Sequence, residues 1–521
     1  MSFGSRLLSG AAIAKSMLTP VERPDRLPRA LVAMAPWGAS IAALVAGATA
    51  RCPDRIAIVD DDGTTTDYRQ LWRRSQALAA ALAARGVGPG VRVGLLARNH
   101  RGFVEAATAV SAAGGDLVLL NTGFAGPQLA DVVAHEGIEV VVHDDEFTDI
   151  VDTCGVRLRI DESDLAALTT SGTVAPPKSP GSVVILTSGT TGRPKGATRS
   201  TDTAGIEGIG AVLDRIPLRL GDTQVIAAPL FHAWGLSHLM LGLARCTTNV
   251  LHRRFDPRDT LRALTNHGAD VLVVVPVMLS RILAVEPHVL EAHRPDGLRV
   301  IASSGSTIGA GLVTRVLDHF GPVLYNLYGS TEVAVATIAT PDDLRRAPAT
   351  AGRVALGVAV EILDADGRAV AEGEIGRIFV GSSMPFDGYT DGGDKERIRG
   401  LLSSGDMGRF EGGLLFVEGR DDDMIVSGGE NVFPGEIEEL LRVHPAVADA
   451  AVIGVDDAEF GQALAAYVVV EQGAHLAVDE LRSFVRDHLA RHKVPRTVRF
   501  VDDLPRNATG KLLRQQLDDR P

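Results

Sequence analysis

The most constraining feature of the chain is a ten-residue segment at 187–196 that is rich in glycine and hydroxyl groups. It reads Thr-Ser-Gly-Thr-Thr-Gly-Arg-Pro-Lys-Gly and directly follows the apolar run at 183–186. A buried strand that opens into such a loop offers backbone N–H groups and hydroxyls to an anion, while glycine permits close approach and lysine adds a positive charge. A Walker P-loop would require Gly-Lys and then Ser or Thr where this chain has Pro-Lys-Gly. The segment therefore predicts a polyphosphate-binding loop of another kind.

The size and composition of the chain indicate a globular protein with two or more domains. A length of 521 residues is too great for one ordinary hydrophobic core. The hydrophobic content of 45%, mostly aliphatic, excludes general disorder. The net charge of -13, with no long basic stripe to offset it, argues against nucleic acid as a partner. It does not argue against ATP, because a few local cations decide phosphate binding.

The cysteines and the first fifty residues bear on where the protein works. Cys52, Cys154 and Cys246 lie far apart, so they suggest neither a disulfide framework nor a metal site, and a reducing cytoplasm is expected. Residues 30–50 carry no charge and are long enough to span a bilayer. Alanine and glycine dominate them, however, and a Pro-Trp-Gly sequence interrupts them. We expect a buried helix over 40–51, and peripheral membrane contact by the first fifty residues stays open.

The pattern between residues 50 and 420 predicts an α/β fold of doubly wound sheets covered by helices. Several apolar runs are continuous in Val, Ile and Leu, which is typical of parallel strands covered on both faces. Expected strands span 91–97, 117–120, 140–143, 183–187, 225–228, 271–275, 300–303 and 323–328, and expected helices span 71–85, 127–135 and 261–267. Ligands bind beyond the carboxyl ends of such strands. We therefore expect the segments at 187–196, 304–306 and 328–330 to converge on one cleft.

A change of pattern near residue 420 predicts a second domain. Residues 417–423 form a short charged crossing, and a compact α+β pattern follows. Its expected elements are helices at 437–441 and 478–490 and strands at 450–455 and 465–470. We expect an ATP- and acyl-binding N-terminal domain over 1–420 and a small mobile C-terminal domain over 421–521, joined by a hinge.

Seven motifs in order resemble those of the adenylate-forming superfamily, which holds acyl-CoA synthetases, non-ribosomal peptide adenylation domains and firefly luciferase. They lie at 187–196, 229–232 (Pro-Leu-Phe-His), 328–332 (Tyr-Gly-Ser-Thr-Glu), 404–406 (Ser-Gly-Asp), 419–422 (Gly-Arg-Asp-Asp), 427–431 (Ser-Gly-Gly-Glu-Asn) and 505–511 (Pro-Arg-Asn-Ala-Thr-Gly-Lys). The resemblance covers about residues 50–515 and is strongest to a bacterial fatty acyl-CoA synthetase. It implies that a carboxylate attacks the α-phosphate of ATP, giving acyl-AMP and pyrophosphate. A thiol, commonly that of coenzyme A, then displaces AMP.

The resemblance implies a nucleotide site built from several of these motifs. Charge builds on the phosphoryl oxygens during adenylation, so donors and a cation should surround them. Mg2+ beside the phosphates needs a carboxylate, and Glu332 matches the family's magnesium residue, with Thr331 donating to the α-phosphate. Tyr328 is expected against the adenine, and Asp406 on the ribose hydroxyls with Arg420 beside it. The expected cofactor-binding residues are Thr187, Ser188, Gly189, Thr190, Thr191, Lys195, Gly305, Ser306, Tyr328, Gly329, Ser330, Asp406, Arg420, Gly428 and Gly429.

The resemblance also implies that the small domain rotates between the two half-reactions. Asp422 matches the hinge residue, and Lys511 matches the lysine that bridges the carboxylate and the α-phosphate during adenylation. After rotation, Gly428 and Gly429 would let the pantetheine arm of coenzyme A run close to the backbone. The expected catalytic residues are Lys511, Thr331, Glu332 and His232.

The acid-binding pocket is less constrained by the sequence. His232 ends the Pro-Leu-Phe-His motif, which lines the acid site in relatives, although a core histidine is a serious alternative. Residues 233–244 are mostly apolar, and Gly205, Gly208 and Gly210 lie on a stretch that relatives use as a pocket wall, which would leave a channel. The absence of a basic cluster for a second carboxylate favours a simple monocarboxylic acid. We expect an acid–thiol ligase of lipid metabolism that acts on a medium- or long-chain fatty acid.

Three alternatives to this function stay open. An aryl or other carboxylic acid–CoA ligase would differ only in the pocket. An acyl-AMP ligase that loads a carrier protein often carries an insertion before the hinge, and the distance from Tyr328 to Asp406 leaves little room for one. A nucleotide-binding scaffold without catalysis is disfavoured because Glu332, Asp406, Arg420 and Lys511 are all present.

Overall fold

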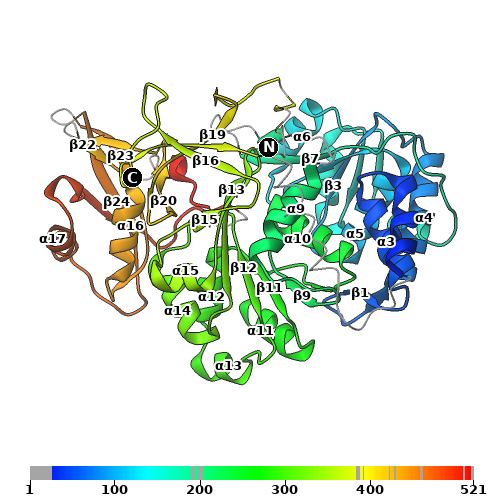
Figure 1. Cartoon of the computed structure of the whole chain (residues 1–521), viewed down its shortest axis with the longest axis horizontal. Coiled ribbons are helices and arrows are strands. Elements are labelled where there is room, and N and C mark those ends of the chain that lie inside the picture. The colour runs from blue at the N-terminus through cyan, green and yellow to red at the C-terminus, as the bar shows by residue number, and fades with distance from the viewer. Residues whose placement is uncertain are drawn as a thin grey trace.

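The computed structural model describes residues 26–188, 194–197, 204–382, 386, 388–390, 392–421, 423–427, 430–457, 461–507 and 511–517. Its described elements form four sheets with helices packed around them (Figure 1). Three sheets and most helices make a large N-terminal part, and a smaller unit with its own sheet lies at one end of the molecule. The predicted fold class, a large α/β domain with a small α+β domain, is confirmed.

The uncharged segment at 30–50 contains a buried helix, as predicted. The first described elements are α2 (Arg26–Met34) and α3 (Ile41–Arg51), with a short 3-10 turn between them. The Ser40 side chain caps α3 by accepting from the Ala43 N–H, and most of the helix is buried. Among the described helices, none combines the length and apolar character needed to cross a bilayer.

The phosphate-loop candidate connects two strands of a six-stranded sheet. The sheet order is β6-β5-β3-β4-β7-β8. Its strands are β3 (Arg92–Leu96), β4 (Asp116–Leu119), β5 (Val140–His143), β6 (Leu158–Ile160), β7 (Val183–Ser188) and β8 (Pro194–Ala197), and its helices include α4 (Tyr68–Ala84), α5 (Arg101–Ala113), α6 (Gly126–His135), α7 (Thr148–Val151) and α8 (Glu162–Leu168). β8 runs antiparallel to β7, so the loop sits at the tip of a hairpin, where Thr187 pairs with Lys195.

The second sheet carries the other predicted nucleotide segments. Its nine strands run in the order β15-β14-β13-β12-β11-β9-β10-β1-β2. They are β1 (Ile56–Val59), β2 (Thr65–Asp67), β9 (Thr223–Ile226), β10 (Thr248–Leu251), β11 (Val271–Val274), β12 (Val300–Ser303), β13 (Leu324–Ser330), β14 (Ala334–Ala339) and β15 (Arg353–Val354). The helices of this region are α9 (Ala204–Arg215), α10 (Ala233–Ala244), α11 (Pro257–Asn266), α12 (Pro276–Leu283), α13 (Pro287–Ala292), α14 (Ala310–Phe320) and α15 (Pro341–Arg346). All eight predicted strands of the N-terminal domain are present in the two sheets, with ends shifted by a few residues.

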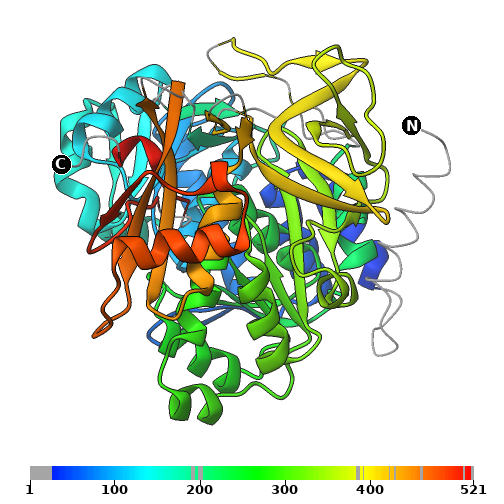
Figure 2. The ribbon, with the colours of Figure 1, turned by 90° about the vertical axis from the view of Figure 1, so that its left-hand side faces the viewer.

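An antiparallel five-stranded sheet is the main element that the sequence pattern did not predict. It comprises β16 (Ala359–Leu363), β17 (Gly376–Gly381), β18 (Arg397–Ile398), β19 (Leu401–Glu411) and β20 (Leu414–Arg420), drawn in yellow-green and yellow in Figures 1 and 2. Glycines and charges interrupt its apolar residues, so no continuous Val/Ile/Leu run marks them. Asp406, the expected ribose-binding carboxylate, lies inside β19.

The C-terminal unit faces the viewer in Figure 2. Its sheet has the order β22-β21-β24-β23, and β25 pairs with β24. The elements are β21 (Ile425–Ser427), β22 (Glu430–Val432), α16 (Pro434–Val443), β23 (Val447–Asp457), β24 (Gly461–Val470), α17 (Val478–His488) and β25 (Thr497–Phe500). Both predicted helices and both predicted strands are present. The domain boundary at 420/421 stays a prediction.

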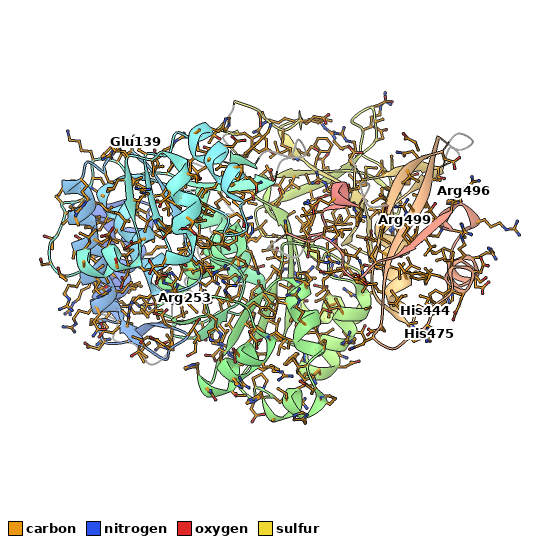
Figure 3. The ribbon with its side chains drawn as sticks, turned by 180° about the vertical axis from the view of Figure 1, so that it is seen from behind. Glu139, Arg253, His444, His475, Arg496 and Arg499 are labelled. Atoms are coloured by element: carbon orange, nitrogen blue, oxygen red, sulfur yellow. The ribbon has the colours of Figure 1, made fainter. Side chains whose placement is uncertain are left out.

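Ion pairs on the rear of the molecule connect elements within one unit. Arg253 approaches Glu162 of α8 to 2.6 Å in the N-terminal part, and Arg496 approaches Asp457 to 3.2 Å in the C-terminal unit. Figure 3 shows Arg253 and Arg496 in opposite halves of the view from behind. These pairs therefore do not hold the two units together.

Candidate active site

Side chains from two different sheets contact Asp406. The Tyr328 hydroxyl, on β13 of the nine-stranded sheet, donates to Asp406 Oδ2 over 2.6 Å. Arg420 is the register partner of Asp406 across β19 and β20, and its Nε lies 3.8 Å from Oδ1. The Asp406 side chain is only 15% exposed. The structure thus brings together three residues that the sequence assigned to the ribose and adenine.

Burial and several nearby cations act in opposite directions on the pKa of Asp406. Burial raises this pKa, which outweighs the lowering by the Tyr328 hydrogen bond and by the charges of Arg420, Lys395 and Lys511. Burial also raises the pKa of Tyr328 well above its usual value, so its hydroxyl stays a donor. Lys511 is exposed, and the Asn507 side chain accepts from its backbone N–H. The charge of Lys511, on the C-terminal unit, therefore acts on Asp406 of β19.

Glu332 is a second carboxylate held in a fixed orientation. Ser330 Oγ donates to Oε2 over 2.8 Å, and the Tyr389 hydroxyl donates to Oε1 over 2.7 Å. Burial by itself would raise the pKa of Glu332, but these hydrogen bonds and the charge of Lys395 outweigh it and lower the pKa. The Glu332 carboxylate is therefore ionised at neutral pH.

The carboxylate at Glu332 suits a magnesium ion that is shared with phosphates. Mg2+ is commonly held by one or two carboxylates together with substrate phosphates and water. Within the described residues, no group of three or more His, Cys, Asp or Glu side chains could form a cage of protein ligands. A metal ion here would have to combine Glu332 with oxygens of the nucleotide.

Strands β7 and β8 form the hairpin whose loop is the phosphate-loop candidate. The described part of this hairpin lies against the segment that carries Tyr389. Lys195 Nζ lies 5.5 Å from the centroid of the Tyr389 ring. The Thr390 N–H donates to the Gly196 carbonyl over 2.8 Å, and Ala197 forms an isolated bridge with Tyr389. Several predicted residues lie outside the described ones, namely the side chains of Thr187 and Ser188 and all of Gly189, Thr190, Thr191, Asp422, Gly428 and Gly429.

Two buried polar side chains near Tyr328 lack hydrogen-bond partners among the described residues. Asn326 Oδ1 and Ser303 Oγ are buried and have no hydrogen-bond partner in the described part of the chain. The two residues are register partners on β13 and β12, and Asn326 shares a face of β13 with Tyr328. Buried polar atoms are rarely left unsatisfied, so this pair fits a ligand with an amino group, such as adenine.

Three further predicted residues lie near the carboxyl ends of these strands. Gly305 and Ser306 come after β12, and Gly329 lies near the end of β13. Gly305 has φ +96, and it lies with Ser306 just after β12, from which Ser304 separates it. A Cβ at Gly329 would lie 1.8 Å from the Ala334 carbonyl, so only glycine fits the turn from β13 to β14. This tight turn positions Ser330, Thr331 and Glu332 beside the crevice.

His232 lies apart from the two carboxylates. It is the N-cap residue of α10, its ring packs on Phe231 at 4.4 Å, and Nε2 is buried without a partner among the described residues. Burial lowers its pKa to about 4, so the ring is neutral at physiological pH. None of the hydrogen bonds or ion pairs of the described residues joins His232 or Ser306 to Glu332 or Asp406. A catalytic role for His232 stays a prediction.

The sequence analysis missed Tyr389, Lys395 and Asn326. Lys395 stands in the charged string Asp-Lys-Glu-Arg, which is typical of a solvated surface. Tyr389 follows a glycine in an irregular stretch, where no periodicity applies. Asn326 precedes the Tyr-Gly-Ser-Thr-Glu motif by only two positions, so its proximity to that motif was the one available signal.

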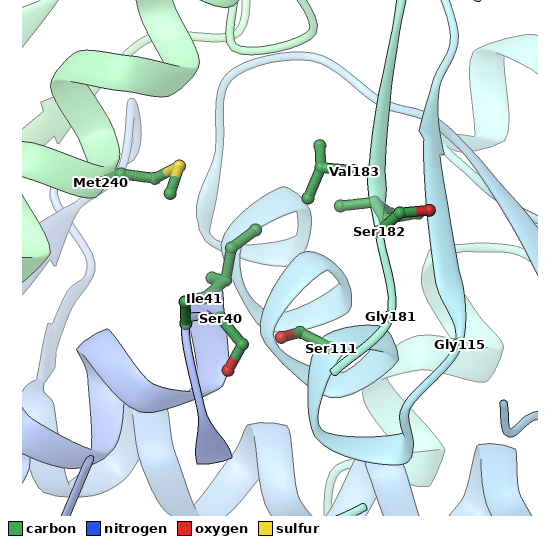
Figure 4. A pocket seen from close by; sticks show the side chains of 10 residues that line it. Ser40, Ile41, Ser111, Gly115, Gly181, Ser182, Val183 and Met240 are labelled. Atoms are coloured by element: carbon green, nitrogen blue, oxygen red, sulfur yellow. The ribbon is translucent and has the colours of Figure 1, made fainter. Parts of the chain in front are cut away.

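A small cavity lies at the start of β7, away from the carboxylates (Figure 4). Ser40, Ile41 and Ser111 line it from α3 and α5, and Met240 reaches it from α10. Its volume of about 30 Å3 has room for one or two waters. It is therefore too small to hold an acyl chain.

Comparisons with known proteins agree with this geometry. The profile of the AMP-binding enzyme family matches residues 45–390, and that of the AMP-binding enzyme C-terminal domain matches residues 436–511. A feruloyl-CoA synthase of Amycolatopsis sp is 34% identical over 90% of this chain and 97% of its own length. The fatty acid–[acyl-carrier-protein] ligase ScoC of Streptomyces coeruleorubidus is 32% identical over 88% of this chain and 92% of its own. The o-succinylbenzoate CoA synthetase MenE of Bacillus subtilis, solved with the acyl-adenylate OSB-AMP, superimposes with a TM-score of 0.82 at 28% identity over 92% of this chain and 98% of its own.

The fold and the crevice define an adenylate-forming enzyme, and the chain belongs to the AMP-binding enzyme family. Within that family it is an enzyme of the AMP-forming acid–CoA ligase type. The predicted family is thereby confirmed, and so is the coarse class of the reaction. The restriction to fatty acids is not.

Proposed function

We propose that this protein uses ATP and Mg2+ to activate a carboxylic acid as acyl-AMP and then transfers the acyl group to coenzyme A. The observation that carries the proposal is the convergence of Tyr328, Arg420 and the charge of Lys511 on Asp406. Such a set can hold a ribose and place a cation beside the α-phosphate. It combines groups from the large N-terminal part and from the small C-terminal unit.

Each residue in the crevice has a role that its geometry suits. Asp406 accepts from the ribose hydroxyls while Tyr328 and Arg420 fix its orientation. Lys511 pairs with the acid carboxylate and the α-phosphate, which brings two anions together and stabilises the charge that develops. A magnesium ion at Glu332 would neutralise phosphate charge when bound.

We propose an aromatic carboxylic acid as the leading substrate class. The feruloyl and succinylbenzoate ligases that resemble this chain act on acids with a ring, as their names state. The glycines of α10 also leave less space than the sequence suggested. A Cβ at Gly235 would lie 2.3 Å from the Pro229 carbonyl, and one at Gly242 would lie 2.3 Å from Gln224 Nε2. These two glycines therefore allow α10 to pack closely against its neighbours, and they do not open a long channel.

A medium- or long-chain fatty acid is the second candidate. The apolar character of α10 supports it, with Leu236, Leu239 and Leu241 buried. The resemblance to the ligase ScoC supports both this acid and, as a further alternative, a carrier protein as the acceptor.

A panel of acids separates these proposals. The purified protein would be incubated with ATP, Mg2+, coenzyme A and either cinnamates, benzoates or fatty acids of C8–C18, and AMP and thioester would be quantified. We expect the highest kcat/KM on a ring-bearing acid. Turnover restricted to fatty acids would exclude the leading acid, and transfer only to a carrier protein would exclude coenzyme A as the acceptor. No AMP from any acid would contradict the proposed function itself.

A further inference from the structure

Tyr389 contacts both sides of the expected phosphate site. Its hydroxyl donates to Glu332 Oε1 over 2.7 Å, and its ring faces Lys195 Nζ at 5.5 Å. Glu332 belongs to the nine-stranded sheet region, whereas Lys195 lies on β8 of the six-stranded sheet. One side chain therefore orients the carboxylate expected to bind the metal ion and also the lysine expected to bind the phosphates.

A buried carboxylate fixes the segment that carries Tyr389. Glu136, at the C-terminal end of α6, is 1% exposed. Its Oε1 accepts from Thr390 Oγ1 over 2.7 Å and from the Gly196 N–H over 3.2 Å, and its Oε2 lies 3.2 Å from Arg92. Charge-assisted hydrogen bonds of this kind are about twice as strong as neutral ones. Glu136 thus joins β8, the second strand of the hairpin that carries the phosphate-loop candidate, to Thr390, which is the residue next to Tyr389.

The contact between these two segments leaves no free space. A Cβ at Gly196 would lie 2.8 Å from both the Oγ1 and the Cγ2 of Thr390, and 2.8 Å from Val184. The backbone hydrogen bond from Thr390 to Gly196 closes the same contact at 2.8 Å. The position of Tyr389 relative to Lys195 is therefore determined by packing as well as by hydrogen bonds.

We propose that Tyr389 is a positioning residue for the triphosphate and its metal ion, held in place by Glu136 through Thr390 and Gly196. It keeps the Glu332 carboxylate and the Lys195 ammonium in the relative orientation that a Mg2+–triphosphate complex requires. AMP lacks the β- and γ-phosphates, so its binding does not depend on this arrangement. The inference rests on the proposed use of ATP and Mg2+.

Packing alone does not explain the hydroxyl of Tyr389. Its ring meets Phe386 edge to face at 4.9 Å, a contact that phenylalanine would preserve. The hydroxyl instead donates to a carboxylate that Ser330 already orients from the other oxygen. Both oxygens of Glu332 are thus fixed before a ligand arrives, which lowers the cost of ordering the site on binding.

Binding of nucleotides by calorimetry tests the proposal without any acid substrate. The probes are α,β-methylene ATP with Mg2+, the same analogue with EDTA, and AMP. For Tyr389→Phe we expect the affinity for the magnesium complex to fall by about tenfold, while that for AMP stays within about twofold. Tyr389→Leu also removes the ring beneath Lys195 and should lose more affinity for the analogue, in EDTA as well as in Mg2+. Tyr325→Phe, which removes a hydroxyl outside the crevice, is the matched control and should change neither affinity.

A second variant keeps the test decisive. Thr390→Val leaves Tyr389 intact but removes its link to Glu136, and we expect a smaller loss in the same direction. Wild-type affinity of Tyr389→Phe for the magnesium complex would overturn the inference, and so would an equal loss of AMP binding. Failure of the wild-type protein to bind the analogue would instead contradict the proposed function.

Discussion

Lys395 lies between the two carboxylates of the crevice. Its Nζ would be 3.2 Å from a Cβ at Gly405, the residue before Asp406. Its charge contributes to the lowered pKa of Glu332 and partly opposes the rise that burial causes in the pKa of Asp406. A cation in this position offsets two negative charges in the free enzyme and can turn toward phosphate oxygens when the nucleotide binds. It is therefore a candidate for binding ATP that the sequence motifs did not include.

Replacing Lys395 by methionine should weaken ATP binding. The variant removes the charge but keeps most of the apolar stem, so we expect the KM for ATP to rise about tenfold, equivalent to the loss of an interaction of ~1.4 kcal/mol. Thioester formation from supplied acyl-AMP should change little. Steady-state kinetics at several ATP concentrations measure the effect, with Lys178→Met as a control at an exposed position. An unchanged KM would show that Lys395 only balances charge.

At the scale of elements, α10 combines an unusual histidine with tightly packed glycines. His238 is fully buried, and neither ring nitrogen has a partner among the described residues. The ring meets Trp234 edge to face at 4.4 Å. Burial, with a smaller contribution from the charge of Arg245, lowers the pKa of His238 to about 3. The helix therefore tolerates only the neutral imidazole.

The stability of the protein should consequently fall in acid through His238. The unfolded chain takes up a proton below about pH 6.5, whereas the folded state does not do so until about pH 3, so stability is complete above pH 6.5 and is lost as the pH falls. From pH 7 to pH 5 the loss is ~2 kcal/mol for this group. Urea unfolding at both pH values should show a smaller difference for His238→Met than for the wild type. An identical difference would mean that the ring is protonated or hydrated in the folded protein.

The glycines of α10 give a separate prediction about packing. Gly235→Ala places a Cβ against the carbonyls of Pro229 and Ala228, so the backbone must move, and we expect a loss of about 1–3 kcal/mol in unfolding free energy. Gly311→Ala on α14 is the matched control, because a Cβ there has nothing within 4 Å. It should be neutral or slightly stabilising. Thermal denaturation of both variants measures the contrast, and equal melting temperatures would contradict the close packing of α10.

At the scale of the whole molecule, the small C-terminal unit packs against the large N-terminal part. The charge of Lys511 acts on Asp406, and a Cβ at Gly309 would lie 3.6 Å from Glu439 of α16. The family resemblance implies an arrangement of this kind, with Lys511 near the nucleotide, for the adenylation step. Thioester formation would then need the unit to rotate so that 427–431 faces the crevice, as the family resemblance implies.

Lys511→Ala should separate the two half-reactions. Without the ammonium, we expect acyl-AMP formation to fall at least about a hundredfold, because the two anions approach without a counter-charge. Transfer from supplied acyl-AMP to coenzyme A should largely survive. Pyrophosphate release measures the first step and thioester formation the second. Equal loss of both would argue against two alternating arrangements.

Much of this fold follows from local patterns. A continuous Val/Leu run predicted β11 almost residue by residue, because parallel strands buried on both faces need apolar side chains throughout. The bounds of β12 also matched the prediction. The uncharged stretch with Ser40 at its start predicted α3 rather than a membrane span. The antiparallel strands β16–β20 were not predicted, because glycines and charged residues interrupt their apolar residues.

The sequence by itself determined the family, and it indicated the glycine-rich loop after β7 and the carboxylates at Glu332 and Asp406 as site candidates, because each depends on residue types at short spacing. The pairing of β7 with β8 appeared only in the structure. Only the tertiary structure decided how Glu136, Gly196 and Tyr389 meet. Thr390 and Glu136 are 254 positions apart, and no local periodicity connects residues at such a separation. Their contact exists because two sheets and an irregular segment pack together, which is a property of the whole folded chain.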